Sequence, residues 1–170
     1  MREIKFRAKT TVKDEDVAFN NEWVEGDLIF SRRKPYIHPK ANAVNVKGEL
    51  GKIIVMHEVQ AETVCQYIGL KDKNRIEIYE GDIVKKYNPK GQECFIEQIL
   101  WGDYGLNDGW CSKGIKNLMG IDNAVYETGF GKFDARYCEV IGNIFDNPEL
   151  LDVDKQAGEY ADNEVLKSAT

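Results

Sequence analysis

The amino-acid sequence predicts a mostly β protein, in which short strands form a small barrel-like sheet structure with few helical turns. Three observations lead to this fold class. Apolar and polar side chains alternate at period two in several segments, and no segment longer than about ten residues shows the period of an amphipathic helix. Turns that contain glycine separate these segments at a spacing of roughly ten residues. The chain has 170 residues, which is long enough to bury a substantial core.

The N-terminal part is expected to consist of short strands joined by polar loops. Alternation begins almost at once, because Ile4, Phe6 and Ala8 fall on one side of a predicted strand over residues 2–9. A second strand is predicted over residues 22–31, with a turn at Glu25-Gly26-Asp27 inside it. Further strands are expected at residues 44–46 and 52–59, followed by one or two helical turns at residues 60–66.

The stretch at residues 66–86 joins the two halves of the chain. A polar run at residues 71–75 predicts one tight turn, and Glu80-Gly81-Asp82 predicts a second, which the Asp82 side chain closes at Gly81. Residues 93–101 form the strongest predicted strand, and residues 139–145 form the last strand. Residues 102–131 are rich in glycine and are expected to be mostly loops, with short strands as candidates at Trp110-Cys111 and Val125-Tyr126-Glu127. Asn147 is the expected N-cap of a short helix that begins at Pro148.

The order of elements suggests how the chain is divided. We expect a β-rich N-terminal part over residues 1–70, a C-terminal part with the strand order of an SH3-like barrel over residues 71–151, and a flexible acidic tail over residues 152–170. A single domain over residues 1–151 is the alternative. The SH3-like pattern is an analogy of fold, and it implies no function.

Composition restricts the class of protein. Hydrophobic residues make up 42% of the chain, charged residues 31%, and the formal net charge is −6. This charge argues against a protein that coats nucleic acid over its whole surface, which requires a cationic footprint. The sequence has neither a signal-peptide core at its N-terminus nor an apolar run of about 18 residues that could cross a bilayer. We therefore expect a cytoplasmic protein of a bacterial host.

The sequence shows no recognisable catalytic or metal-binding pattern. The cysteines are far apart and the two histidines do not flank them, so we expect buried thiols in a reducing cytosol, with no zinc site. The carboxylates near the central turns lack the spacing of a calcium loop and are expected to be solvated turn residues. We predict no cofactor, no metal and no enzymatic activity. The cysteines, histidines and carboxylates considered for such roles are Cys65, Cys94, Cys111, Cys138, His38, His57, Asp72, Glu77, Glu80 and Asp82.

One basic segment is a candidate nucleic-acid site. Basic residues interleaved with an aromatic can contact phosphates and stack on a base, and this segment contains Arg32, Arg33, Lys34, Tyr36 and Lys40. The simpler interpretation is a solvated hairpin loop that Pro35 and Pro39 stiffen, and we favour it.

Several motifs together resemble the YopX family of small phage and prophage proteins. They are Arg2-Glu3-Ile4-Lys5-Phe6-Arg7-Ala8, Gly26-Asp27-Leu28, Glu62-Thr63-Val64, Gln66-Tyr67-Ile68-Gly69-Leu70-Lys71-Asp72-Lys73-Asn74, Ile78-Tyr79-Glu80-Gly81-Asp82-Ile83-Val84 and Glu139-Val140-Ile141-Gly142-Asn143-Ile144-Phe145-Asp146-Asn147-Pro148-Glu149-Leu150-Leu151. The resemblance implies a β-rich fold and a phage or prophage origin, and it implies no activity. Its structural motif residues are Gly69, Asp72, Tyr79, Gly81, Asp82, Gly142 and Asn143.

The chain departs from the pattern of this family at two places. Arg75 stands where members commonly have glycine, and Gln60-Ala61 replaces a frequent Asp-Pro. If the first position requires a positive φ, arginine there costs about 1 kcal/mol, and a different turn type is expected. A turn started by proline is correspondingly less expected at the second position.

The function that follows is a non-enzymatic binding or adaptor module that acts on a protein of the host or phage and that can assemble into a homo-oligomer. Exposed sheet edges and the aromatic-rich region between Trp101 and Trp110 would supply the contact. The alternative is association with nucleic acid through the basic segment at residues 32–40.

Overall fold

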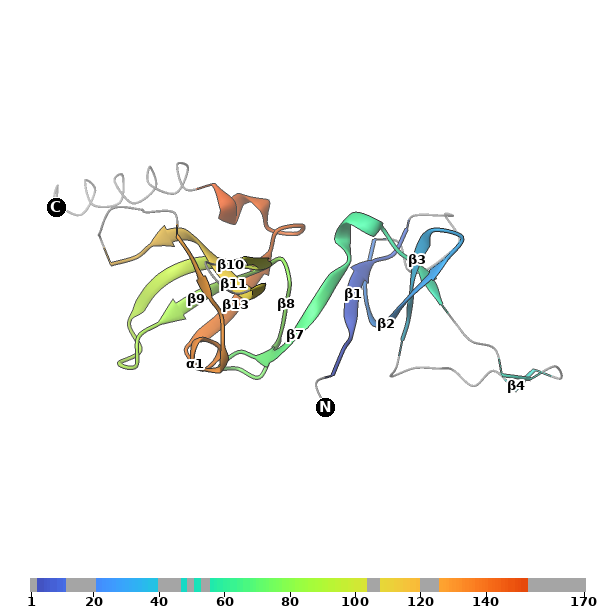
Figure 1. Cartoon of the computed structure of the whole chain (residues 1–170), viewed down its shortest axis with the longest axis horizontal. Coiled ribbons are helices and arrows are strands. Elements are labelled where there is room, and N and C mark those ends of the chain that lie inside the picture. Colours follow the sequence, from blue (N-terminus) through green and yellow to red (C-terminus); the bar gives the residue numbers. More distant parts are fainter. Residues whose placement is uncertain are drawn as a thin grey trace, which may run out of the picture. The chain divides into compact units, whose positions relative to one another are not determined.

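The computed structural model describes residues 3–11, 21–39, 47–48, 51–52, 56–103, 108–119 and 126–152 of the chain (Figure 1). The chain divides into two compact units, Met1–Gly69 and Leu70–Thr170. Antiparallel strands dominate both units, so the prediction of a mostly β protein is confirmed. The expected strand at residues 44–46 and most of the expected tail lie outside the described residues.

The first unit is built on one antiparallel sheet. Its strands follow the order β6-β3-β2-β1-β7, and their bounds are His57–Glu58, Lys34–His38, Trp23–Ser31, Phe6–Lys9 and Cys65–Lys71. A short 3₁₀ helix, η1 (Ala61–Thr63), precedes β7, and β4 (Lys47–Gly48) pairs separately with β5 (Gly51–Lys52). The core of the unit consists of Ala8, Ile37 and Val59, against which partly buried apolar side chains pack.

Strand β2 runs straight through Glu25-Gly26-Asp27, so the turn predicted there is wrong. These residues pair in register with β1 on one side and β3 on the other. Gly26 is buried, and a side chain at this position would collide with the backbone carbonyl of His38. Glycine is therefore needed here because the neighbouring strand approaches closely. The sequence suggested a turn because a glycine between two acidic residues is compatible both with a turn and with a strand.

Strand β3 occupies most of the segment that was predicted to be a proline-stiffened loop. It begins at Lys34 and contains Pro35, which is buried opposite Phe30 of β2. Only Arg32 and Arg33 remain as the loop of the β2–β3 hairpin, because Ser31 pairs directly with Lys34. The carbonyl of Pro35 accepts a hydrogen bond from Val59, so this proline takes part in the sheet through its acceptor alone.

The second unit is organised around a five-stranded antiparallel sheet of order β12-β11-β10-β9-β13. The bounds of these strands are Glu127–Gly129, Asp108–Asn117, Glu93–Asp103, Asp82–Tyr87 and Cys138–Asn143. Strand β7 leads into this unit, and β8 (Glu77–Tyr79) is next to it in strand order. Within the described residues β12 and β13 are the two ends of the sheet, so the sheet does not close into the predicted barrel.

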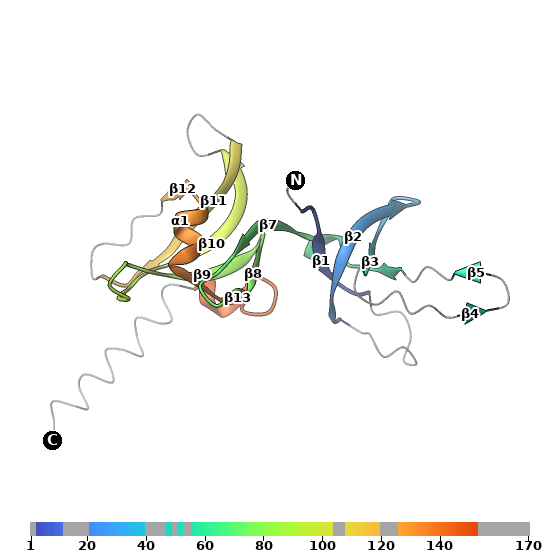
Figure 2. The ribbon, with the colours of Figure 1, turned by 90° about the horizontal axis from the view of Figure 1, so that it is seen from below.

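Two features of the second unit differ from what the sequence pattern indicated. Strand β11 extends over ten residues despite Gly109 and Gly114, whereas the sequence indicated only a short strand at Trp110-Cys111 within a loop-rich segment. A short helix, α1 (Lys132–Arg136), was not expected; it precedes β13 and is labelled beside the sheet in Figure 2. The expected helix start at Asn147 and Pro148 is present, but the element is a 3₁₀ helix, η2 (Pro148–Leu151).

Candidate functional site

The side chain of Asp72 binds the turn between β7 and β8 to the last strand of the sheet. The residue is only 5% exposed. Its Oδ1 atom accepts hydrogen bonds from the backbone N–H groups of Asn74 and Ile76 at 2.8 and 2.9 Å. Its Oδ2 atom accepts one from the N–H group of Val140 in β13 at 3.0 Å. Asp72 is therefore a buried structural carboxylate, and it is not a solvated turn residue as the sequence suggested.

The same turn keeps the left-handed backbone at Arg75, where φ is +67°. The N–H group of Arg75 donates to the carbonyl oxygen of Asp72 at 3.0 Å, and that of Lys73 donates to the carbonyl oxygen of Cys138 at 3.0 Å. The conformational cost of arginine, about 1 kcal/mol, is offset by hydrogen bonds of similar net value. The turn also occupies backbone groups at the outer edge of β13, which protects that edge from further strand pairing.

The second predicted turn has the geometry that the sequence indicated. Asp82 is buried, and its Oδ2 atom accepts a hydrogen bond from the N–H group of Tyr79 at 2.8 Å. Gly81 adopts φ +79°; its N–H group donates to Ile99, and its carbonyl oxygen accepts from Ile144. The short turn is thus joined to two other segments of the sheet through its glycine backbone.

A third turn follows β13. The Oδ1 atom of Asn143 accepts hydrogen bonds from the N–H groups of Phe145 and Asp146 at 2.9 and 3.0 Å. The Asn147 side chain turns back toward β13, where its Oδ1 accepts from the N–H group of Asn143, and it does not cap η2. A Cβ atom at Gly142 would collide with this side chain, so glycine is required there.

These contacts explain why the motif residues stand where they do. Asp72, Asp82 and Asn143 each satisfy backbone N–H groups of a turn, and Gly81 and Gly69 (φ +84°) supply left-handed backbone. Tyr79 is buried and donates its hydroxyl hydrogen to Glu77 at 3.1 Å. The motif residues therefore have a structural role in the turns of the second unit and at its boundary with the first.

The sequence did not predict the buried ionic cluster of the second unit, formed by Lys86, Glu97, Asp134 and Tyr126. Glu97 is fully buried in the middle of β10. The Tyr126 hydroxyl donates to Glu97 Oε1 at 2.6 Å, and Lys86 Nζ lies 3.3 Å from Glu97 Oε2 and 2.9 Å from Asp134 Oδ1. The one available signal was that Glu97 alternates with the apolar residues Phe95, Ile99 and Trp101 on one face of the predicted strand.

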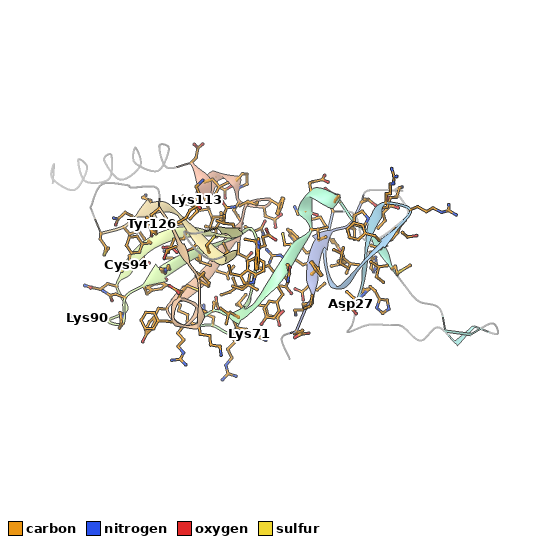
Figure 3. All side chains as sticks on the ribbon, in the orientation of Figure 1. Asp27, Lys71, Lys90, Cys94, Lys113 and Tyr126 are labelled. Carbon is orange, nitrogen blue, oxygen red and sulfur yellow. The ribbon has the colours of Figure 1, made fainter. Side chains whose placement is uncertain are left out.

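Tyr126 reaches Glu97 because its ring lies over the backbone of β11. Gly114 pairs opposite Glu97, and a Cβ atom at Gly114 would stand only 2.8 Å from the nearest atom of the Tyr126 ring. The ring also packs edge-on against Phe95, with centroids 5.7 Å apart (Tyr126 is labelled in Figure 3). A glycine that suggested a loop thus makes room for an aromatic ring within a strand.

The titration of these groups follows from burial and from the neighbouring charges. Burial lowers the pKa of Lys86, but hydrogen bonding and charge interactions with Asp134 and Glu97 raise it more, so the net shift is upward. Burial, and then the hydrogen bond to Glu97, raise the pKa of Tyr126. Burial raises the pKa of the Cys138 thiol to about 12. At neutral pH Lys86 therefore stays charged, and the nearby Cys138 thiol stays protonated. A protonated buried thiol is typical of a structural cysteine and not of an activated nucleophile.

The described residues contain no other arrangement suited to chemistry. All four cysteines are buried thiols. In the part of the chain that the structure describes, no group of three or more histidine, cysteine, aspartate or glutamate side chains is placed to hold a metal ion. None of the helices found there is both long and apolar enough to span a membrane.

The structure describes four of the five residues of the predicted nucleic-acid site. Lys34 and Tyr36 lie on one face of β3 and bind the same carboxylate, with Lys34 Nζ 3.0 Å from Glu58 Oε1 and the Tyr36 hydroxyl 3.2 Å from Glu58 Oε2. Arg32 and Arg33 are exposed in the hairpin loop, whereas Lys40 lies outside the described residues. Of the four described residues, two are thus engaged by Glu58 and the two arginines are exposed.

Two apolar residues lie next to Arg32 and Arg33 at the end of the β2–β3 hairpin. Phe30 is 67% exposed and Ile29 is also exposed, although both belong to β2. We call Ile29, Phe30, Arg32 and Arg33 the β2–β3 tip. Reasoning from sequence did not single out its apolar part, because an apolar residue in a predicted strand does not reveal whether it is buried or exposed.

A second exposed aromatic feature lies on the other unit. Trp101 of β10 and Trp110 of β11 are direct cross-strand partners, and their rings meet edge-to-face with centroids 5.0 Å apart. Trp101 is 53% exposed. We call these two residues the tryptophan pair. They begin and end the region that the sequence proposed for protein contact.

The arrangement defines a class of protein: an antiparallel β protein of two units whose polar residues are used for turns and for one internal ionic cluster, with aromatic residues left at the surface. The YopX protein family model matches residues 5–152, and the chain belongs to that family. A crystal structure of protein EF1440 from Enterococcus faecalis is similar at 22% identity and a TM-score of 0.45, over 89% of this chain and 99% of that one. Curated proteins gave no match.

Proposed function

We propose that this protein is a non-enzymatic protein-binding or adaptor module of phage or prophage origin, which acts in the cytoplasm of a bacterial host. Its partner is a protein of the host or phage, and the tryptophan pair is the contact surface on the second unit. The observation that carries this proposal is the exposure of Trp101, 53%, on a strand that is paired with β11 from Phe95 to Asp103.

An exposed tryptophan held in this way is suited to binding. Tryptophan is enriched among the residues that contribute most to protein–protein affinity, and it loses little conformational entropy when it is already fixed. The edge-to-face contact with Trp110, at an interplanar angle of 84°, holds the ring before a partner arrives. Covering the exposed half of a tryptophan removes roughly 100 Å² of mainly apolar surface from water, which contributes about 2–3 kcal/mol.

The geometry favours a protein partner over nucleic acid. Phosphate binding depends on the number of lysine and arginine side chains that contact the backbone. Of the predicted basic residues, Lys34 already forms an ion pair with Glu58 and Tyr36 donates to the same carboxylate. Arg32 and Arg33 alone provide a small electrostatic footprint on a chain of net charge −6.

The test is capture of partners by the intact protein from a lysate of the bacterial host, with bound proteins and nucleic acids both identified. Three baits are compared: the natural protein, Trp101→Thr and, as a matched control, Phe133→Ser, which removes another exposed aromatic of the second unit. Threonine suits a strand, so Trp101→Thr is expected to fold.

We expect at least one protein to bind the natural bait and the Phe133→Ser bait equally. Loss of a central tryptophan worth about 2 kcal/mol weakens binding by about 30-fold, so the same protein should be lost from Trp101→Thr. The proposal is wrong if no captured protein depends on Trp101, or if the purified complex contains nucleic acid in place of protein.

A further inference from the structure

The β2–β3 tip has an unusual backbone for the residues that occupy it. The loop contains two residues, because Ser31 pairs with Lys34, and both loop residues have positive φ: +48° at Arg32 and +68° at Arg33. A two-residue hairpin loop with positive φ at both positions belongs to the class in which Asn-Gly is strongly preferred. Two arginines adopt this backbone less favourably, so the turn itself does not explain their presence.

Among the residues that the structure describes, the two arginines have no ion-pair partner. Both are exposed, and neither forms an ion pair with a residue that the structure describes. Lys34, the residue that follows the two arginines, forms an ion pair with Glu58 of β6 on the face of β3 that carries Tyr36. The tip therefore presents two unpaired guanidinium groups, each with several donors arranged to bind carboxylates.

Phe30 gives this charged tip an apolar side. Its register partner is the buried Pro35, so Phe30 lies on the face of the hairpin that carries the core residue Ile37. Unlike those two residues it is 67% exposed, because it lies beyond the covered part of the sheet. Aromatic residues and arginine are both enriched at protein interfaces.

We propose that the β2–β3 tip is a second docking site, which binds an acidic segment of a partner protein through Arg32 and Arg33 and accepts an apolar side chain of that segment against Phe30. Charge complementarity determines this choice of partner. Two unpaired cations on a chain of net charge −6 select carboxylates, whereas two phosphate contacts give nucleic acid little affinity at physiological salt.

The test uses a fluorescein-labelled peptide in which four glutamates flank one leucine, with binding to the full chain followed by fluorescence anisotropy. The comparison ligands are the same peptide with glutamines and a 20-nucleotide single-stranded DNA. The key variant is the double substitution Arg32→Asn with Arg33→Gly. It removes both charges and installs the pair that the turn prefers, so the hairpin is retained or stabilised.

We expect the natural protein to bind the glutamine peptide at least tenfold more weakly than the glutamate peptide. We expect the Asn-Gly variant to bind the glutamate peptide at least tenfold more weakly than the natural protein does. The variant Arg32→Lys with Arg33→Lys should lose less, because charge is kept while bidentate geometry is lost. Phe30→Ser should weaken binding of the glutamate peptide. Trp101→Thr should bind the glutamate peptide normally, so failure here is distinguishable from failure of the tryptophan pair.

Four results would overturn the proposal. They are absence of binding to the glutamate peptide, equal binding of the two peptides, unchanged affinity in the Asn-Gly variant, and tighter binding of the DNA than of the glutamate peptide. Sedimentation of the protein alone provides a further check. A dimer that the natural protein forms and the Asn-Gly variant does not would identify a second copy of this chain as the occupant of the tip, and would likewise refute an acidic partner segment.

Discussion

Replacing Asp72 by asparagine tests whether one buried carboxylate holds the second unit together. The carboxylate accepts three backbone hydrogen bonds, two within its own turn and one from Val140 in β13. Asparagine can keep its oxygen on the turn, but its NH₂ group then faces the Val140 N–H group, so two donors meet. A charge-assisted hydrogen bond is lost and a buried donor is left unsatisfied.

The expected loss of stability follows from these contacts. A hydrogen bond to a charged group is worth about 1.5–3 kcal/mol, and an unsatisfied buried donor adds a cost of similar size. We therefore expect Asp72→Asn to lower the free energy of unfolding of the second unit by about 3 kcal/mol, and Asp72→Ala to lower it further, because both acceptor oxygens and all three hydrogen bonds are lost. Domains are commonly stable by about 5–15 kcal/mol, so this loss is large.

The measurement is urea unfolding followed by tryptophan fluorescence. A Trp23→Phe background leaves the tryptophan pair of the second unit as the reporter, since Trp23 belongs to the first unit. With urea m-values of about 1–3 kcal/mol per molar, the midpoint should fall by about 1–3 M. Glu93→Gln is the control: it removes an exposed carboxylate that pairs with Lys85 and should change stability by less than about 1 kcal/mol.

A site-specific readout completes this test. Hydrogen exchange of the Val140 amide should become much faster in Asp72→Asn than in the natural protein, because its acceptor has been removed. If the urea midpoint of Asp72→Asn equals that of Glu93→Gln and the Val140 amide stays protected, the Asp72 side chain does not join the turn to β13, and the account of the motif residues given above is refuted.

Two further predictions concern the buried ionic cluster. Gly114→Ala should displace the Tyr126 ring, whose nearest atom would be 2.8 Å from the new Cβ, and lower stability by about 1–3 kcal/mol in urea unfolding; Lys113→Ala, at an exposed neighbour, should change little. Alkaline pH should also destabilise the second unit. The Cys138 thiol has an ordinary pKa of 9.0 and a folded pKa of about 12, so the folded state holds its proton more tightly. The stabilisation from this difference is fully present below pH 9 and is lost as pH rises toward 12, with a slope of up to about 1.4 kcal/mol per pH unit. Cys138→Ala should flatten this dependence between pH 9 and pH 11; an unchanged slope would contradict the assignment.

The structure limits what kind of function this chain can have more than the family assignment does. Its most distinctive sequence motifs are used by the turns, where side chains such as Asp72 and Asn143 satisfy backbone groups. The surfaces proposed for binding lie outside those motifs, at the β2–β3 tip and at the tryptophan pair. Substitutions in the motifs should therefore reduce stability, whereas substitutions in the two surfaces should reduce binding and leave the fold intact.

The sequence alone predicted those features that depend on a few neighbouring residues. Period-two alternation indicated a β protein, Glu80-Gly81-Asp82 indicated a turn closed by its aspartate, and Asn147 with Pro148 indicated the start of a helical turn. The motifs indicated the YopX family, which the family model confirms. Such features are local because a turn is stabilised by side chains bonding to backbone two to four residues away.

Tertiary structure alone decided which distant residues meet. Gly26 and Gly114 are typical of turns in the sequence, yet both lie within strands because another strand or ring passes over them. Glu97 and Tyr126 are 29 residues apart, and Asp72 and Val140 are 68 apart, so only strand register brings each pair together. Register is set by the burial of whole faces of a sheet and not by any local pattern, and for that reason the ionic cluster and the exposed tip could not be foreseen.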